Sequence, residues 1–289
     1  MFQQILVNGL VLGGIYAMLA LGFALVFGVA RIINLAHTAF YMLAAYGLYF
    51  FVSRLGLSMW LAIPLVIILV SLIGVASYLL FIKPVSEHED AMLIVTIALA
   101  IVIQEAMLIG FGGSYRSVPT VAKGFTEVLG VRAGNQELLT LGVGVVVLVG
   151  VWLFLMRTRW GLAVRAAAQD REVANLMGID VNRAATLTIF IGMGMAALAG
   201  AAVAPLATVT PLMWNYPLII VLASVILGGL GSLVGALVGA FVLAFSEVMV
   251  VSLVPNGSYL RTAVALAIMV VVLLVKPSGL FGVDVEAER

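Results

Sequence analysis

Long stretches without any charged residue constrain this chain more than any other feature. The uncharged stretches are residues 1–30, 32–53, 55–82, 138–156 and 184–246. A helix needs about 20 consecutive apolar residues to cross the hydrocarbon core of a membrane, whereas soluble domains carry about one charged residue in four. Only 9% of this chain is charged, and 64% of it is hydrophobic. The sequence therefore predicts an all-α integral membrane protein.

The apolar stretches divide into eight segments of a single transmembrane domain over residues 1–289. We predict helices near residues 5–30, 32–52, 59–82, 91–112, 138–156, 184–208, 217–250 and 259–275. The seventh segment is too long for one upright helix and too short for two full spans, and "GGLGS" (228–232) interrupts its middle. A hairpin of short helices or a broken helix fits it best. The prediction is a polytopic bundle of about eight or nine helices with broken or re-entrant segments.

Basic residues predict how the chain is oriented in the membrane. The loop 157–183 holds five arginines, so the positive-inside rule makes it cytoplasmic and places the N-terminus outside. With nine crossing segments the C-terminus is inside. The N-terminal stretch lacks the basic region of a secretory signal and is predicted to be a retained first span. Trp214 is expected in the outer aromatic belt, and Arg31 as an anchor at the inner interface.

A polar cluster interrupts the second predicted span. Asn34, His37, Thr38 and Tyr41 recur at i, i+3, i+4 and i+7, which on a helix forms one stripe. Lipid offers these groups no hydrogen-bond partner, so the stripe is predicted to face the bundle interior or a wet cavity. Two readings remain open: hydrogen bonds to neighbouring helices, or a translocation pathway that also includes Asn8 of the first span.

Two acids interrupt apolar stretches. A proton relay requires such residues, but Glu105 and Glu247 lie near predicted helix ends, where a side chain reaches water easily. We therefore predict a structural role for both.

Small residues recur at a spacing of four in three places, which lets helix backbones approach closely. The sets are Gly9, Gly13 and Ala17; Gly192, Ala196, Gly200 and Ala204; and Gly231, Gly235 and Gly239. Gly228 and Gly229 extend the third set into a stretch where unwound backbone is permitted beside a cavity or inside protein. We predict close packing and backbone flexibility for Gly228, Gly229, Gly231, Gly235 and Gly239.

The arginine-rich loop predicts an amphipathic helix over residues 162–177. Its apolar face gathers Leu162, Ala166, Val173, Leu176 and Met177, and Gly178 suits a C-terminal cap. Such a helix either lies on lipid headgroups or docks into a partner, and its short apolar face and added acids favour docking. The candidate docking residues are Leu162, Arg165, Ala166, Asp170, Val173, Ala174, Leu176, Met177 and Gly178.

Motifs for catalysis and cofactor binding are missing from the sequence. There is no G-x-x-x-x-G-K-[ST] phosphate loop, no H-E-x-x-H and no cysteine, and the two histidines, His37 and His88, are far apart. We expect no catalytic, metal-binding or cofactor-binding residues and no nucleic-acid partner. If transport consumes ATP, another chain must bind it.

Three stretches together carry a resemblance that runs over nearly the whole chain. They are "NGLVLGGIYAMLALGFALVFGVARIINLAHTAFYMLAAY", "GLAVRAAAQDREVANLMGIDVNRA" and "VILGGLGSLVGALVGAFVL". The sequence resembles the permease subunits of branched-chain amino acid ABC importers, the LivH-like type. In that family the loop matching 161–178 meets the ATPase. The usual E-A-A followed closely by Gly is altered here, since Ala166–Ala168 precede Gly178 by ten residues or more.

The resemblance implies a function and a set of partners. A permease of this type pairs with a second, homologous permease in the bacterial inner (cytoplasmic) membrane. It receives leucine, isoleucine or valine from a periplasmic binding protein, and two cytoplasmic ATPase subunits bind ATP and Mg and drive transport. Related permeases carry urea, short amides or aromatic acids, and no residue here selects among them. A secondary transporter or channel for a small polar solute, and a membrane-embedded enzyme, are the competing readings.

Overall fold

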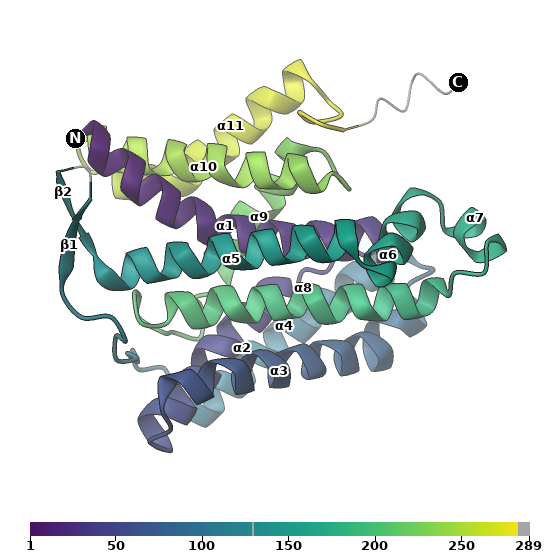
Figure 1. Ribbon diagram of the computed structural model, residues 1–289, viewed down its shortest axis with the longest axis horizontal. Helices are drawn as coiled ribbons and strands as arrows, with labels where there is room; N and C mark the ends of the chain where they lie inside the picture. Colours follow the sequence, from purple (N-terminus) through teal and green to yellow (C-terminus); the bar gives the residue numbers. More distant parts are fainter. Residues whose placement is uncertain (129, 283–289) are drawn as a thin grey trace.

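The computed structural model describes residues 1–128 and 130–282, so the predicted domain 1–289 extends beyond the described part. The chain forms a bundle of roughly parallel and antiparallel helices (Figure 1). Seven apolar helices in the described residues are long enough to cross a membrane. They are α1 (Phe2–Ala30), α3 (Met59–Ser77, continued by non-α helical turns to Val85), α4 (Glu89–Phe111), α5 (Asn135–Arg157), α8 (Val181–Val203), α10 (Leu233–Leu253) and α11 (Arg261–Val275, preceded by a 3₁₀ turn from Gly257). The predicted all-α membrane fold is confirmed.

Short helices complete the bundle and its two ends. Within the bundle lie α2 (His37–Tyr49, continued by a π-helix to Arg54) and α9 (Asn215–Gly228). At one end lie α6 (Arg159–Gln169) and α7 (Arg171–Leu176), and we call this the inner end, following the predicted orientation. The opposite, outer end carries the hairpin β1 (Phe125–Val128) and β2 (Val131–Gly134), which the sequence analysis did not predict.

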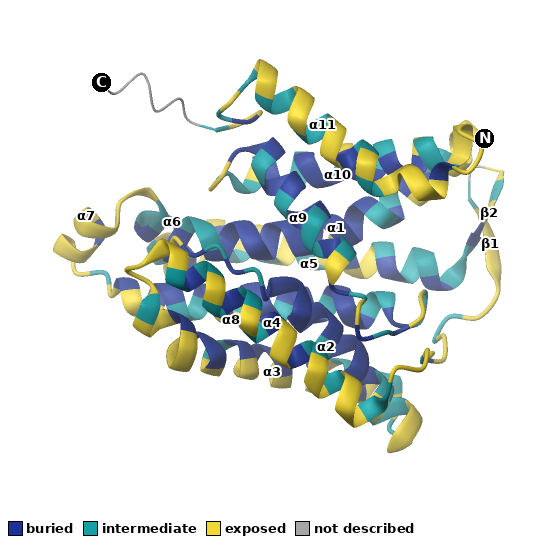
Figure 2. Ribbon diagram, turned by 180° about the vertical axis from the view of Figure 1, so that it is seen from behind, coloured by how far each residue is buried: buried dark blue, intermediate teal, exposed yellow. Residues whose placement is uncertain are grey.

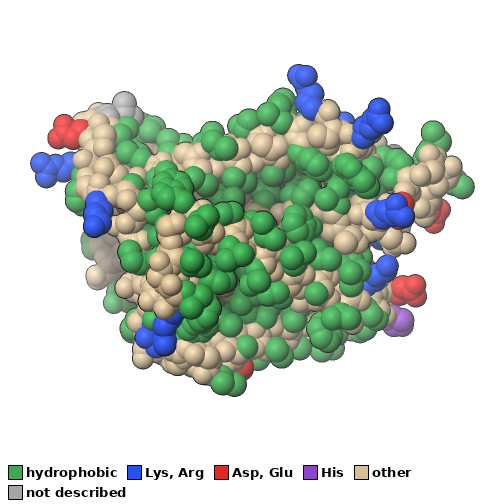
Figure 3. Space-filling model, turned by 60° about the horizontal axis from the view of Figure 1, so that its bottom comes forward, with side chains coloured by type: hydrophobic (Ala, Val, Ile, Leu, Met, Phe, Trp, Pro, Cys, Tyr) green, Lys and Arg blue, Asp and Glu red, His purple; other side chains and the backbone are tan. Residues whose placement is uncertain are grey.

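Helix α1 is the axis of the bundle. It packs against α5, α6, α8, α9 and α10, and its most apolar window is 83% buried, compared with 6% for the span that contains α11. Figure 2 shows the same contrast between the buried α1 and the exposed α11. In Figure 3, hydrophobic side chains cover the middle of one face, whereas charged side chains lie mainly toward its edges. This is the surface that a bilayer requires of a membrane protein.

The second predicted span, 32–52, is wrong at its start. Helix α1 ends at Ala30 and is followed by Arg31, which is exposed and adopts a left-handed backbone conformation with φ 58°. The chain then turns back into the bundle, and α2 begins only at His37. His37 Nε2 donates to the carbonyl oxygen of Leu19 at 3.1 Å. Leu19 lies eleven residues before Ala30 in α1. The start of α2 therefore lies about 16 Å from the inner end of α1, toward the middle of the bundle.

The long segment 217–250 folds as a hairpin, one of the two predicted forms, but only one of its helices is short, because α10 has 21 residues and is long enough to cross a membrane. Helix α9 has only 14 residues, about 21 Å, and is therefore shorter than the hydrocarbon core, which is about 30 Å thick. The turn after α9 uses two glycines in left-handed conformations, Gly229 with φ 101° and Gly231 with φ 89°. Ser232 then caps α10 by accepting from Gly235 N at 3.0 Å. With α2 and α9 added to the seven long helices, nine helical segments in the described part of the chain cross all or part of the bundle.

Small residues let α9 and α10 touch backbone to backbone. A Cβ atom at Gly228 would collide with the backbone of Gly235, and one at Gly239 would collide with the carbonyl oxygen of Ser224. Residue 228 of α9 faces residue 235 of α10, and residue 224 faces residue 239, so the two helices run antiparallel along one continuous contact. Gly231 does not share this role, because nothing lies within 4 Å of its Cβ position. Its place in the structure is the turn.

We predict that Gly239→Val destabilises the fold, because the new side chain must displace the Ser224 backbone. Overpacking of this kind costs about 1–3 kcal/mol, and rigid backbone places the cost at the upper end. The measurement is the thermal unfolding and monodisperse yield of the purified protein. Gly150→Val is the matched control, since Gly150 lies in α5 with open space around it. Equal behaviour of the two variants would contradict the close crossing.

Candidate transport pathway

A cavity of about 540 Å³ opens in the outer half of the bundle. It lies between α1, α9, α10 and the residues that follow α8, and it reaches inward to Leu19 and Tyr41. Most of its wall is apolar, and the polar residues that line it are Asn8, Tyr16, Tyr41, Glu137, Tyr216, Glu247, Ser252 and Arg261. A concave, largely apolar site with a few placed polar groups is the usual form of a small-molecule site.

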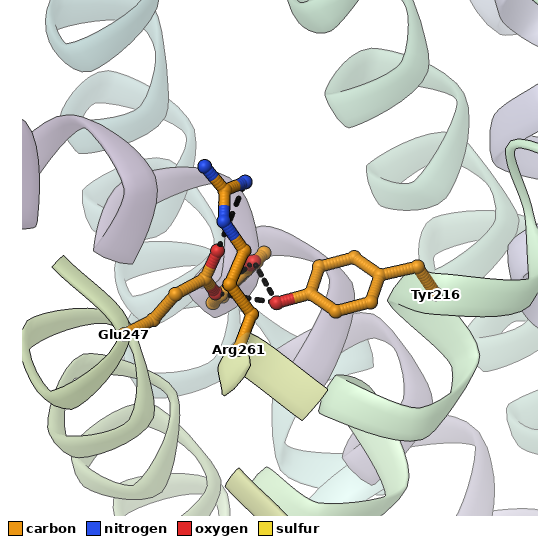
Figure 4. A network of polar contacts seen from close by, with 4 residues as sticks. Tyr216, Glu247 and Arg261 are labelled. Atoms are coloured by element: carbon orange, nitrogen blue, oxygen red, sulfur yellow. Dashed lines mark hydrogen bonds and ion pairs between the residues drawn. The ribbon is translucent and has the colours of Figure 1, made fainter. Parts of the chain in front are cut away.

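Glu247 is the centre of a polar network in this cavity. Its Oε2 accepts hydrogen bonds from the hydroxyls of Tyr16 and Tyr216, each at 2.6 Å, and its Oε1 pairs with Arg261 at 3.4 Å (Figure 4). The Glu247 side chain is only 4% exposed, whereas that of Arg261 is 45% exposed. The network joins four helices, because Tyr16 comes from α1, Tyr216 from α9, Glu247 from α10 and Arg261 from α11.

The prediction that Glu247 reaches water from near a helix end is therefore wrong. A buried carboxylate in the membrane must find partners inside the protein, and here two tyrosines and an arginine supply them. Glu105 differs, because it is exposed and, among residues 1–128 and 130–282, accepts only from its neighbour Gln104 at 3.2 Å. Gln104 also accepts from the buried Trp214 indole at 2.8 Å, so Trp214 does not lie in an interfacial belt as predicted.

The inner boundary of the cavity is a buried polar break. Directly inward of Leu19 and Tyr41 lie Asn34, His37 and Thr38, each at most 3% exposed. Asn34 is not part of a helical stripe, since it precedes α2 and its Oδ1 accepts from Ala36 N at 3.0 Å. His37 also packs edge-on against Phe23, with the ring centroids 5.8 Å apart. This arrangement closes the cavity at mid-bundle.

Two side-chain atoms in the break lack a partner among the described residues. They are Nδ1 of His37 and Oγ1 of Thr38. Buried polar atoms are almost always hydrogen-bonded, so such exceptions require an explanation. Of the five predicted pathway residues, Asn8 and Tyr41 thus line the cavity, whereas Asn34, His37 and Thr38 lie beneath its floor.

At the inner end, the loop forms two helices and not the single helix predicted over 162–177. Asp170 separates them, because its Oδ1 accepts from the backbone N–H groups of Glu172 and Val173 at 2.9 and 3.0 Å and so starts α7 as a new helix. Thr158 similarly starts α6 by accepting from Gly161 N at 2.9 Å. Gly178 follows α7 with φ 82°, as expected for a residue that ends a helix.

The two inner helices lie at the end of the bundle, with α7 projecting beyond it (Figure 1), and both carry exposed apolar side chains. Leu162, Val173, Leu176 and Met177 are 58%, 53%, 86% and 77% exposed. Arg165, Ala166, Asp170 and Gly178 are partly or fully accessible. Ala174 is the exception among the predicted docking residues, because it is buried against this chain's own core. A substitution at Ala174 would disturb the loop itself and cannot test docking.

Comparisons with known proteins identify the family to which this architecture belongs. The family model described as "Branched-chain amino acid transport system / permease component" matches residues 5–273. The chain belongs to that family. It is a permease component of a branched-chain amino acid ABC transport system, a multi-pass membrane protein and not an enzyme. The resemblance found in the three sequence stretches is confirmed.

Several relatives match the permease over nearly its full length. It is 30% identical to the high-affinity branched-chain amino acid transport system permease protein BraD of Pseudomonas aeruginosa, over 97% of this chain and 96% of the relative. It is 28% identical to the corresponding protein LivH of Salmonella typhimurium, with the same coverage. A probable LivH of Methanocaldococcus jannaschii is 25% identical over 98% of this chain and 93% of its own.

A solved structure supports the fold. The permease aligns with PsaBC from Streptococcus pneumoniae, solved in complex with Fab, at a TM-score of 0.52 and 15% identity, covering 99% of this chain and 95% of that one. At this level of identity the match concerns the fold alone.

The sequence analysis missed the network around Glu247. In the sequence, the network is marked only by one acidic residue in an apolar stretch. The partners of Glu247, which are Tyr16, Tyr216 and Arg261, lie 231, 31 and 14 residues away along the chain. No spacing rule joins positions so far apart. Only the packing of four helices brings them together.

We predict that Tyr16→Phe destabilises the permease, because it removes a hydrogen bond to a buried carboxylate. Such bonds contribute about 1.5–3 kcal/mol in soluble proteins and less between membrane helices, so we expect a loss of about 1 kcal/mol. Thermal unfolding of the purified protein measures it. Tyr115→Phe at an exposed outer position serves as the control. A Tyr16→Phe protein as stable as this control would show that the bond contributes nothing.

Proposed function

We propose that the permease moves leucine, isoleucine or valine inward by alternating access. The observation that carries this proposal is the cavity in the outer half of the bundle, which stops at the buried polar break formed by Asn34, His37 and Thr38. A pathway that is blocked at mid-bundle corresponds to one state of an alternating-access cycle. The unpaired atoms of His37 and Thr38 support the same reading, because water or a passing polar group would satisfy them when the break opens.

The cavity wall supports a branched apolar side chain as cargo. Val11, Leu12, Ile15, Val203 and Leu206 line it together with few polar groups. The curated relatives are themselves described as branched-chain amino acid transport permeases. In this proposal a periplasmic binding protein delivers the solute and supplies much of the selectivity, so the cavity binds it weakly.

Two ATPase subunits, which carry the ATP and Mg, would drive the cycle through α6 and α7. The exposed Leu162, Val173, Leu176 and Met177 support docking into a partner groove, since isolated apolar side chains on a projecting helix gain from burial. Arg171 donates to the carbonyl oxygen of Ala30 at 3.4 Å, and α6 packs on α8. Motion of the docked helices would therefore reach the ends of α1 and α8 directly.

The proposed assembly contains a second, homologous permease and lies in the bacterial inner membrane. Co-purification through a tag on this chain tests the assembly, and leucine uptake by the reconstituted complex tests the function. Recovery of an ATPase and a second permease, with ATP-dependent uptake, is expected. Recovery of this chain alone with leucine uptake intact would favour a secondary transporter or channel.

We predict that Leu176→Asp separates the ATPase from the permease. The change replaces the most exposed apolar side chain of α7 with a carboxylate. Burying that carboxylate in a partner groove is unfavourable. ATPase recovery and leucine uptake should fall about tenfold while membrane insertion stays normal. Leu55→Asp makes the same change at the outer end, where Leu55 is 56% exposed, and should leave both unchanged. Normal recovery and uptake with Leu176→Asp would rule out this docking surface.

We predict that Thr38→Val slows transport without weakening the fold. Valine matches threonine in shape, and losing an unpaired buried hydroxyl should leave stability unchanged or raise it by about 1 kcal/mol. Uptake should nevertheless fall if the hydroxyl is used when the break opens. The measurement pairs initial uptake rate with thermal unfolding. Full uptake with unchanged stability would place Thr38 outside the pathway.

A further inference from the structure

We propose that the network around Glu247 and Arg261 is a binding subsite for the charged head group of an α-amino acid. This inference rests on the proposed function and adds the residues that recognise the ammonium and carboxylate groups. The subsite lies in the outer cavity, above the floor formed by Leu19 and Tyr41. It would hold the solute before the break opens.

Arg261 has the free donors that a carboxylate needs. Its guanidinium carries five N–H donors in a planar fork, and among the described residues it engages only Glu247, through one nitrogen at 3.4 Å. The side chain is 45% exposed and lines the cavity. An entering carboxylate therefore meets an accessible guanidinium whose geometry suits a two-point contact.

Glu247 and the two tyrosines offer three acceptors for an ammonium group. The hydroxyls of Tyr16 and Tyr216 both donate to Glu247 Oε2, so the remaining lone pairs of their oxygens are free to accept. These two oxygens lie 3.5 Å apart, and all three side chains line the same cavity. With Glu247 Oε1 they form a set that matches the three N–H donors of an ammonium ion.

The charges of the cavity fit a zwitterion better than an anion. The charged residues that line it are Glu137, Glu247 and Arg261, so two negative charges face one positive charge. Glu137 is engaged by the backbone N–H of Gly134 at 3.1 Å. A solute with both an ammonium and a carboxylate gives each member of the Glu247–Arg261 pair a new partner and adds no net charge to the membrane interior. A dicarboxylate or a fatty acid would add an unbalanced negative charge.

A network that only holds four helices together and a network that binds solute predict different experimental results. Both roles account for the hydrogen bonds, but only a subsite responds to the head group of an added solute. The natural absence of cysteine makes this testable, since a single introduced thiol reports local access. Ser252 lines the cavity and is exposed, so Ser252→Cys places the thiol there with little change in size.

The experiment measures the rate at which a membrane-impermeant methanethiosulfonate labels Ser252→Cys in the reconstituted complex. Leucine is expected to slow labelling, whereas leucinamide, which lacks the carboxylate, and 4-methylpentanoate, which lacks the ammonium, should not at the same concentration. In Arg261→Gln or Glu247→Gln, half-protection should require about tenfold more leucine, because each change removes a charged hydrogen-bond partner. Ser58→Cys, at an exposed outer position away from the cavity, should be labelled at one rate throughout.

Tyr216→Phe keeps the test decisive if the charge variants fail to fold. It removes one acceptor and leaves the ion pair, so it should weaken protection by leucine while labelling without leucine stays unchanged. Equal protection by leucine and 4-methylpentanoate would overturn the subsite, as would undiminished protection in all three variants. ATP-dependent leucine uptake without any protection would also overturn it and leave the proposed function standing. Failure of the unsubstituted complex to take up leucine would instead reject the proposed function.

Discussion

The absence of water from the membrane interior is the constraint on which this structure depends. Every backbone N–H and C=O at that depth must be paired within the protein, so broken helices are allowed only where other helices surround them. Helix α1 provides that surrounding, because it is buried along most of its length and packs against five other helices. The chain accordingly buries Asn34, in the break before α2, inside the bundle, whereas the turn after α9 lies beside Gly28 at the inner end of α1, where Leu230 and Gly231 are exposed.

The same constraint explains why small residues and one buried network hold the bundle together. Lipid is as apolar as leucine, so apolar side chains gain little from facing a helix in place of lipid, and close backbone contact supplies the attraction. Gly228 with Gly235 and Gly239 with Ser224 provide such contacts between α9 and α10. The Glu247 network adds the polar counterpart, linking the peripheral α11 to α1, α9 and α10.

The sequence predicted the long helices because their signal is local. An uncharged stretch of helical length leaves few alternatives, and the turn at 228–232 was visible from its glycines. The start of α2 was mispredicted because Asn34 fits the helical spacing of His37 and Thr38 by chance. Asp170 was placed inside the predicted helix 162–177, although a residue of its type also caps a new helix. The partners of Glu247 were beyond sequence reasoning, since their proximity depends on how four helices pack.

The contact between α1 and α8 has a mechanical consequence. A Cβ at Gly22 would lie 2.9 Å from the carbonyl oxygen of Gly192, so the two helices meet there without intervening side chains. Such a crossing leaves few side chains to rearrange when the angle between the helices changes, chiefly Val26 beside Gly192. It would act as a fulcrum in the middle of the membrane. Tilting α8 about this point would narrow the space above it as it widens the space below, so one rotation can close one side of the protein and open the other.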